Sequence, residues 1–107
     1  MAGIQNLAIH DATSATTVGS GTLIWTADAN YLVSVIATNT GTTDAEISVT
    51  VKTSGGTEAG GALIAYKLPL PTYNSYETFR FGLNDTDAIY IAGSAGVRYF
   101  VQGLEQT

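Results

Sequence analysis

Residues 31–52 read YLVSVIATNTGTTDAEISVTVK. From residue 45 to residue 52 apolar and polar side chains alternate strictly, which is the two-residue period of a β-strand with one buried and one solvated face. This alternation puts Val49 on the buried face and Thr50 on the solvated face. Residues 31–38 are apolar on both faces. The stretch therefore predicts a β-hairpin whose first strand lies centrally in a sheet or under a neighbour.

Similar short apolar segments follow one another along the rest of the chain. They are separated by segments rich in Gly, Pro, Asn and Asp, and no window shows the period of an amphipathic helix. This pattern predicts an all-β protein, an antiparallel β-sandwich of about 7–8 strands. The sequence leaves open whether the strands follow a jelly roll or an immunoglobulin-like Greek key.

The predicted core consists of the inward positions of these strands. Alternation within each strand assigns most of them, and Trp25 is added because its strand is strongly apolar. The predicted core residues are Trp25, Val33, Val35, Ile47, Val49, Val51, Phe79, Ile89, Ile91, Tyr99 and Val101.

The N-terminal segment differs in composition from the rest. Its second half is mostly Thr, Ser, Ala and Gly, which cannot bury enough apolar surface to fold alone. We expect residues 1–21 to form an extended arm or an edge strand and residues 22–107 to form the sandwich domain. Ile4, Leu7 and Ile9 are the apolar residues with which such an arm would contact a neighbour.

Composition narrows the classes of partner. The chain of 107 residues has no Cys, so packing rather than disulfides or thiolate metal sites must stabilise it. Its net charge is -5 and its basic residues are scattered, so we expect no nucleic-acid partner. No secretory signal opens the chain, and no apolar run approaches the roughly 18 residues that span a bilayer. We therefore expect no membrane association and synthesis in a cytoplasm.

No catalytic or metal-binding constellation is visible. His10 is the only histidine and has no second ligand nearby in the sequence. Asn84, Asp85 and Asp87 offer oxygen ligands for calcium, but they lack the spacing of an EF-hand loop, and an Asx turn is the simpler interpretation. The glycine-rich loop at 53–61 lacks the Lys of a phosphate-binding loop. We expect a non-enzymatic protein with no catalytic residue, no metal and no cofactor.

Two tyrosines beside the prolines are candidates for a contact patch. Tyr73 and Tyr76 follow Pro69 and Pro71, outside the alternating strands. Flat amphipathic rings contribute contact area at little entropic cost, in protein interfaces and in sugar-binding sites alike. We therefore predict that Tyr73 and Tyr76 are exposed interface residues.

Several short segments of this sequence also occur, in the same order, in a known family of proteins. They are Trp25-Thr26, the long apolar strand from Tyr31 to Thr40, Ser48 to Val51, Pro69 to Pro71, Asp87 to Ile91, and Val101 to Glu105. In this order they resemble the small β-sandwich structural proteins of tailed bacteriophages, over about Leu23 to Glu105. The Gly that often precedes the Asp in those proteins is Thr86 here, which departs from the pattern.

The resemblance implies a virion component that is made in the host cytoplasm and is present in many copies. Its expected partners are the major capsid protein or other virion proteins, and a homo-oligomer is expected, with a trimer as one option. Within this class we favour a capsid decoration (cement) protein on the outer shell. Two alternatives stay open: a tail, baseplate or fibre component, and, from another class, a carbohydrate-binding β-sandwich module using Tyr73, Tyr76 or Trp25.

Overall fold

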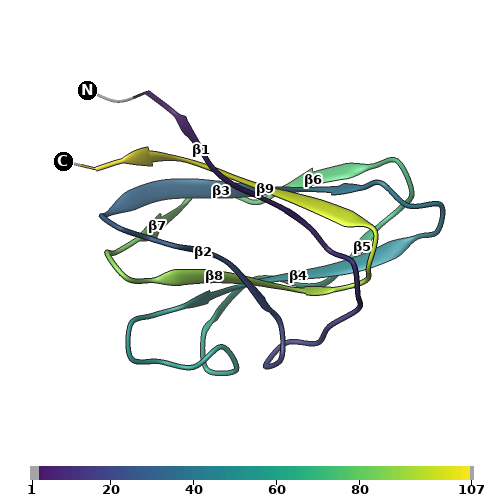
Figure 1. Cartoon of the computed structure of the whole chain (residues 1–107), viewed down its shortest axis with the longest axis horizontal. Coiled ribbons are helices and arrows are strands. Elements are labelled where there is room, and N and C mark those ends of the chain that lie inside the picture. The colour runs from purple at the N-terminus through teal and green to yellow at the C-terminus, as the bar shows by residue number, and fades with distance from the viewer. Residues whose placement is uncertain (1–2, 107) are drawn as a thin grey trace.

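The computed structural model describes residues 3–106 and contains two antiparallel sheets packed face to face (Figure 1). Sheet A has the order β1-β9-β3-β6, with β7 also paired to β3, and sheet B has the order β2-β8-β4-β5. No helix in the described residues could cross a membrane. The strands are β1 (Gln5–Asp11), β2 (Thr22–Thr26), β3 (Tyr31–Asn39), β4 (Ala45–Lys52), β5 (Ala62–Leu70), β6 (Ser75–Glu77), β7 (Phe81–Leu83), β8 (Ala88–Gly93) and β9 (Val97–Glu105).

The predicted all-β antiparallel sandwich is confirmed, and the strand order decides its topology. Most successive strands lie in opposite sheets, and the β4–β5 connection stays within sheet B. With these orders in the two sheets, the chain follows a jelly roll rather than an immunoglobulin-like Greek key.

The predicted hairpin over residues 31–52 is wrong. β3 and β4 are both strands, but β3 pairs with β9, β6 and β7 in sheet A, while β4 pairs with β5 and β8 in sheet B. The link at 40–44 therefore crosses between the sheets. It lies beside the turn between β8 and β9, because Thr40 N donates a hydrogen bond of 2.9 Å to Gly96 O. The central position predicted for β3 is confirmed, since β9 flanks it on one side and β6 and β7 flank it on the other.

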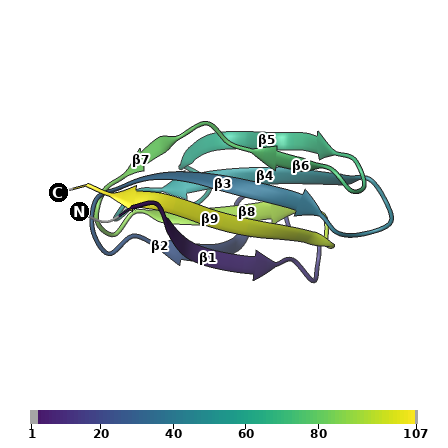
Figure 2. The ribbon, with the colours of Figure 1, turned by 90° about the horizontal axis from the view of Figure 1, so that it is seen from above.

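The N-terminal segment contributes the outer strand of sheet A. β1 pairs with β9 along its length, with an irregularity between Asn6 and Ala8. Beyond it, Ala12 N donates to Val97 O, and Thr16 forms an isolated bridge with Gly93. Figure 2 shows β1 and β2 along one side of the sandwich and β5, β6 and β7 along the other. The described part of this segment thus lies against the sandwich.

The two inner faces form one apolar core. Of the predicted core residues, the following are buried: Val33, Val35, Ile47, Val49, Val51, Ile89, Ile91, Tyr99 and Val101. Trp25 is half-buried, packs against this core and meets the Tyr31 ring edge-on, with 4.9 Å between the ring centroids.

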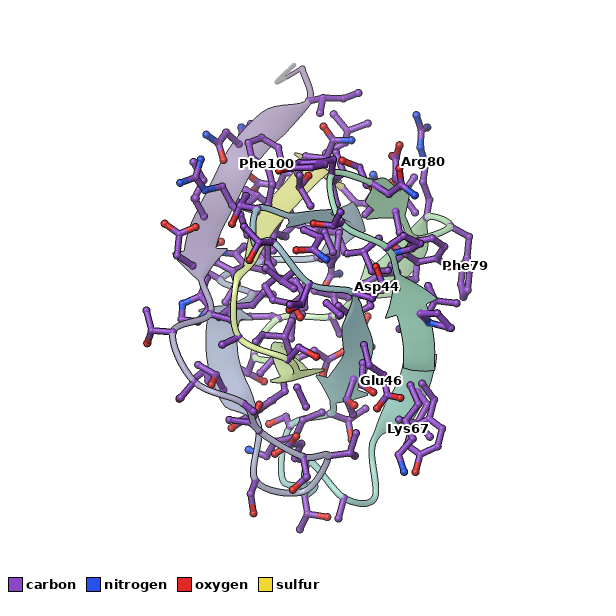
Figure 3. The ribbon with its side chains drawn as sticks, turned by 90° about the vertical axis from the view of Figure 1, so that its right-hand side faces the viewer. Asp44, Glu46, Lys67, Phe79, Arg80 and Phe100 are labelled. Carbon is purple, nitrogen blue, oxygen red and sulfur yellow. The ribbon has the colours of Figure 1, made fainter. Side chains whose placement is uncertain are left out.

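Phe79 does not lie in the core, in contrast to the prediction, because its side chain is 63% exposed. The chain does not run as one strand through this region but breaks between β6 and β7. Thr78 turns inward there, where its Oγ1 accepts a hydrogen bond of 3.0 Å from Val35 N and its own N donates to Val35 O. Phe79 consequently points away from the sandwich (Figure 3), and Phe81 packs against the core instead.

The face of β4 that was predicted to be solvated is largely covered. Thr50 is only 2% exposed and Ser48 is also buried. A Cβ on Gly61 would lie 2.9 Å from Thr50 Cγ2, so the backbone just before β5 lies against this threonine. Farther along β5, Lys67 N donates a hydrogen bond of 2.9 Å to Ser48 Oγ. The alternation places these residues on the outer face of sheet B. That face is covered by other residues here and is not exposed to solvent.

The Tyr99 hydroxyl gives the core a measurable pH dependence. It is buried without a hydrogen-bond partner among the described residues, and burial raises the pKa of Tyr99 to about 12. Between about pH 10 and about pH 12 the unfolded chain loses this proton while the folded chain keeps it, so stability falls as the pH rises. We expect the wild type to lose roughly 2–3 kcal/mol across this range relative to Tyr99→Phe.

Urea unfolding of both proteins between pH 8 and pH 12 would measure this difference. Near neutral pH, Tyr99→Phe should be as stable as the wild type or more stable by about 1 kcal/mol, because it removes a buried donor that has no acceptor. A variant less stable than the wild type at neutral pH would mean that the hydroxyl does find a partner.

Candidate docking surface

The outer face of sheet A carries apolar side chains that are in register across three strands. Phe100 of β9 lies opposite Ile9 of β1 and Ile36 of β3, and Leu104 of β9 lies opposite Leu32 of β3. Directly opposed residues of antiparallel strands point to the same face, and these five alternate with the core positions. Ile9 is exposed and the other four are half-buried. We call these five residues the docking face; Figure 3 shows Phe100 on this side of the sheet.

A small hollow lies at the Leu32 and Leu104 end of the docking face. Its volume is about 70 Å³, and Ile4, Arg80 and Gly103 also line it. Ile4 and Arg80 are exposed. The hollow can receive an apolar side chain from a partner, and the Arg80 guanidinium at its side can bind a partner carboxylate.

A polar bridge separates the two apolar parts of the docking face. Gln102 Nε2 donates to Ser34 Oγ at 3.2 Å and to Glu77 Oε2 at 3.4 Å, and Ser34 Oγ donates to the same carboxylate oxygen at 3.2 Å. These groups satisfy one another within the chain. The Ser34 and Gln102 donors therefore do not need partners from another molecule, which limits their desolvation cost on docking.

One ion pair borders the docking face. Arg98 Nε lies 2.7 Å from Asp11 Oδ1, and this hydrogen bond lowers the pKa of the Asp11 carboxyl and raises that of the Arg98 guanidinium. Both side chains are well exposed, so the pair contributes little to stability. An apolar centre with a polar and charged border is the usual composition of a protein interface.

The predicted interface residues are distributed over different parts of the molecule. Ile9 belongs to the docking face and Ile4 lines the hollow beside it. Leu7 is half-buried and packs against the core. Tyr73 is 78% exposed at the turn between β5 and β6, whereas Tyr76 packs against the core. The structure therefore joins Ile4 and Ile9 in one region and leaves Tyr73 elsewhere.

Phe100 and Leu104 are candidate interface residues that the sequence reasoning missed. For the last strand, only the inward residues Tyr99 and Val101 were predicted, as part of the core. Its outward positions also include Phe100 and Leu104, so this strand is apolar on both faces, as is β3. Two adjacent strands of this kind were the signal that could have identified the docking face.

The acidic turn near residue 85 has a structural use. Asp87 is buried, and its carboxylate accepts hydrogen bonds from Ser54 N at 3.2 Å and from Asn84 N at 2.9 Å. It thereby joins two loops, and its bond from Asn84 N spans three residues, which differs from the predicted Asx turn. Within residues 3–106 no group of three or more His, Cys, Asp or Glu side chains is arranged to hold a metal ion.

Comparison with known proteins shows similarity in structure alone. No protein-family model and no curated protein matches the sequence. The VP2 subviral particle of infectious bursal disease virus superposes with a TM-score of 0.53 at 9% identity, over 96% of this chain and 32% of that chain. The nucleoplasmin-like N-terminal domain of Drosophila FKBP39 gives 0.54 at 12% identity, over 100% and 92%.

A third similar structure is the CBM22-1–GH10 part of Clostridium thermocellum xylanase 10B. It gives a TM-score of 0.50 at 14% identity, over 98% of this chain and 26% of that chain. This chain spans less than a third of the xylanase chain and about a third of the viral chain. At such identities the three likenesses show a shared β-sandwich fold.

Proposed function

We propose that this protein is a non-enzymatic structural component of a tailed-phage virion, a capsid decoration protein that docks on the outer shell through the outer face of sheet A. The docking face carries this proposal. It carries two apolar clusters in cross-strand register, Phe100 with Ile9 and Ile36 and Leu104 with Leu32, on either side of the polar bridge. Apolar clusters that remain partly exposed on one face of a sheet are typical of interaction sites.

The fold and the sequence segments support the same class. The jelly roll occurs in the VP2 subviral particle of an icosahedral virus, so the fold is compatible with a place in a shell. The segments quoted above resemble small phage structural proteins. Both arguments concern the class of protein, whereas the docking face supplies the means of attachment.

The size of the docking face fits a modest interface. β3 and β9 each have 9 residues, and at about 3.3 Å per residue they are roughly 30 Å long. Three strands about 4.8 Å apart then give a footprint of roughly 400–450 Å². A standard interface buries about 800 Å² per partner. The remainder has to come from the border of the face, including Ile4 and Arg80, or from many copies acting together.

Phe100→Glu is the direct test of this docking. It places a charge at the centre of the face, and we expect binding to capsids that lack this protein to weaken by about 100-fold, as for a central interface residue. Co-sedimentation with purified capsids would measure the affinity. Circular dichroism would check that the variant folds, which we expect because Phe100 is half-buried on the outer face.

Tyr73→Glu is the matched control, because Tyr73 is exposed at the turn between β5 and β6 and is not one of the docking-face residues. It should bind capsids as the wild type does. Equal binding by both variants would contradict docking through sheet A. If wild-type protein binds tails or fibres and not capsids, as immunogold labelling of particles would show, the tail, baseplate or fibre alternative replaces the capsid.

A further inference from the structure

A groove with both polar and apolar lining lies on the outer face of sheet B, on the side of the sandwich opposite the docking face. Its volume is about 170 Å³. Because the strand order is β2-β8-β4-β5, β8 and β4 supply its floor, the linker before β2 supplies one wall and β5 supplies the other. The lining residues used below are Thr16, Thr17, Glu46, Ser48, Tyr66, Lys67 and Gly93.

Backbone contacts hold both walls in place. On one side, Thr16 N donates to Gly93 O at 2.9 Å and Gly93 N donates to Thr16 O at 3.0 Å. On the other side, Lys67 has a φ of 48° and its N donates to Ser48 Oγ, which makes β5 bulge and leaves Tyr66 and Lys67 exposed. The groove is therefore built by specific backbone geometry on both sides.

Gly93 adds no side chain of its own to the floor of the groove. Its φ is 124°, and a Cβ there would collide with the carbonyl oxygen of Glu46. Only glycine fits this close approach of β8 to β4. The result is that polar groups of the neighbouring residues remain reachable from outside.

The groups around the groove are those that recognise hydroxyls. Glu46 can accept hydrogen bonds and Lys67 can donate them (Figure 3). Ser48 Oγ accepts from Lys67 N and has no acceptor for its own hydrogen among the described residues. The Tyr66 ring adds an aromatic surface, with Lys67 Nζ 5.5 Å from its centroid. One acid and one base oppose each other, so the groove does not favour a charged ligand.

We propose that this groove binds a neutral saccharide. The Tyr66 ring contacts the C–H face of one sugar unit, and the exposed Glu46 and Lys67 side chains bind its hydroxyls. A phosphate or other anion is disfavoured because Glu46 offsets the single lysine. Since the docking face lies on the other sheet, a copy attached to a larger assembly through sheet A still presents this groove to solvent.

Titration with neutral hexasaccharides would test the groove directly. The probes are cellohexaose, xylohexaose, maltohexaose and mannohexaose, followed by amide chemical shifts of the full chain, with polygalacturonate as the anionic comparison. We expect at least one neutral probe to bind in the millimolar range or tighter and to shift residues 16–18, 46–48 and 66–67. Absence of binding by all four, or stronger binding of polygalacturonate, would overturn the proposal.

Two variants locate the binding in the groove. Tyr66→Ala should weaken the affinity for the bound hexasaccharide by about tenfold, and it should fold because Tyr66 is exposed. Lys67→Met, which keeps the length of the side chain, should weaken it by a smaller factor. Tyr73→Ala is the control and should bind unchanged. Loss of binding in Tyr73→Ala with none in Tyr66→Ala would place the sugar elsewhere and refute the assignment.

Discussion

Val49→Asp should be strongly destabilising. Val49 is 0% exposed and lies opposite Ile91 of β8 and Ala65 of β5, in the middle of sheet B. A carboxylate there has no partner for its charge and displaces close-packed apolar atoms. We expect a loss of about 4 kcal/mol or more, which is a large part of the roughly 5–15 kcal/mol that stabilises a typical domain. Urea unfolding followed by the fluorescence of Trp25, the only tryptophan, would measure it.

Thr26→Asp is the control for the added charge. Thr26 is an exposed residue at the end of β2, so the same carboxylate stays hydrated and stability should change by about 0.5 kcal/mol or less. Thr50→Asp is informative in another way. The sequence pattern predicted that position 50 is solvated, whereas its burial, with Gly61 packed against it, now predicts clear destabilisation. A tolerated Thr50→Asp together with a disruptive Val49→Asp would contradict this covering.

The sequence predicted the strands far better than their partners. The alternation in residues 45–52 depends only on which side of a strand meets the core, and both the strand and its buried face are found. Which strands pair with each other depends on whether the link between two successive strands stays within one sheet or crosses to the other. A link as short as 40–44 suits a hairpin, but it can also carry the chain across the sandwich. Nothing in the local pattern distinguishes these paths, because both strands present an apolar face to the same core.

Phe79 illustrates a second limit. Alternation extended from Glu77 to Phe81 only on the assumption that the strand is regular. Instead, the buried Thr78 side chain accepts a hydrogen bond from Val35 N, and Thr78 N donates to Val35 O. A hydrophobic pattern does not reveal a polar side chain that bonds to the backbone in this way. One irregular residue is enough to reverse the side on which the next residue lies.

The docking face could be predicted only in part, because it depends on which strands are neighbours in sheet A. Exposed Ile4 and Ile9 were singled out from their place in a polar segment, before their strand partner was known. Phe100 and Ile36 meet across β9 and β3 although they are distant in sequence, so the register of sheet A was needed to see that they form one surface with Ile9. The polar bridge around Gln102 likewise joins residues from separate strands.

Asn39→Asp should be the most disruptive substitution outside the apolar core. Asn39 is 1% exposed, and its Nδ2 donates to Thr43 O at 2.9 Å and to Leu70 O at 3.0 Å, while its Oδ1 accepts from Gly41 N at 2.9 Å. One amide thus ties the link at 40–44 to the end of β5. A carboxylate of the same shape loses both donors and faces two carbonyl oxygens, which should cost about 3 kcal/mol or more at neutral pH.

The pH dependence of this loss separates its cause from a simple change of shape. Protonation restores one donor and removes the charge, so the deficit of Asn39→Asp relative to the wild type should shrink as the pH falls toward about 4. Urea unfolding at several pH values would follow it. Asn74→Asp is the control: Asn74 is exposed in the turn before β6, and its side chain should tolerate the charge at every pH. A deficit in Asn39→Asp that does not vary with pH would mean that packing, rather than these hydrogen bonds, makes Asn39 necessary.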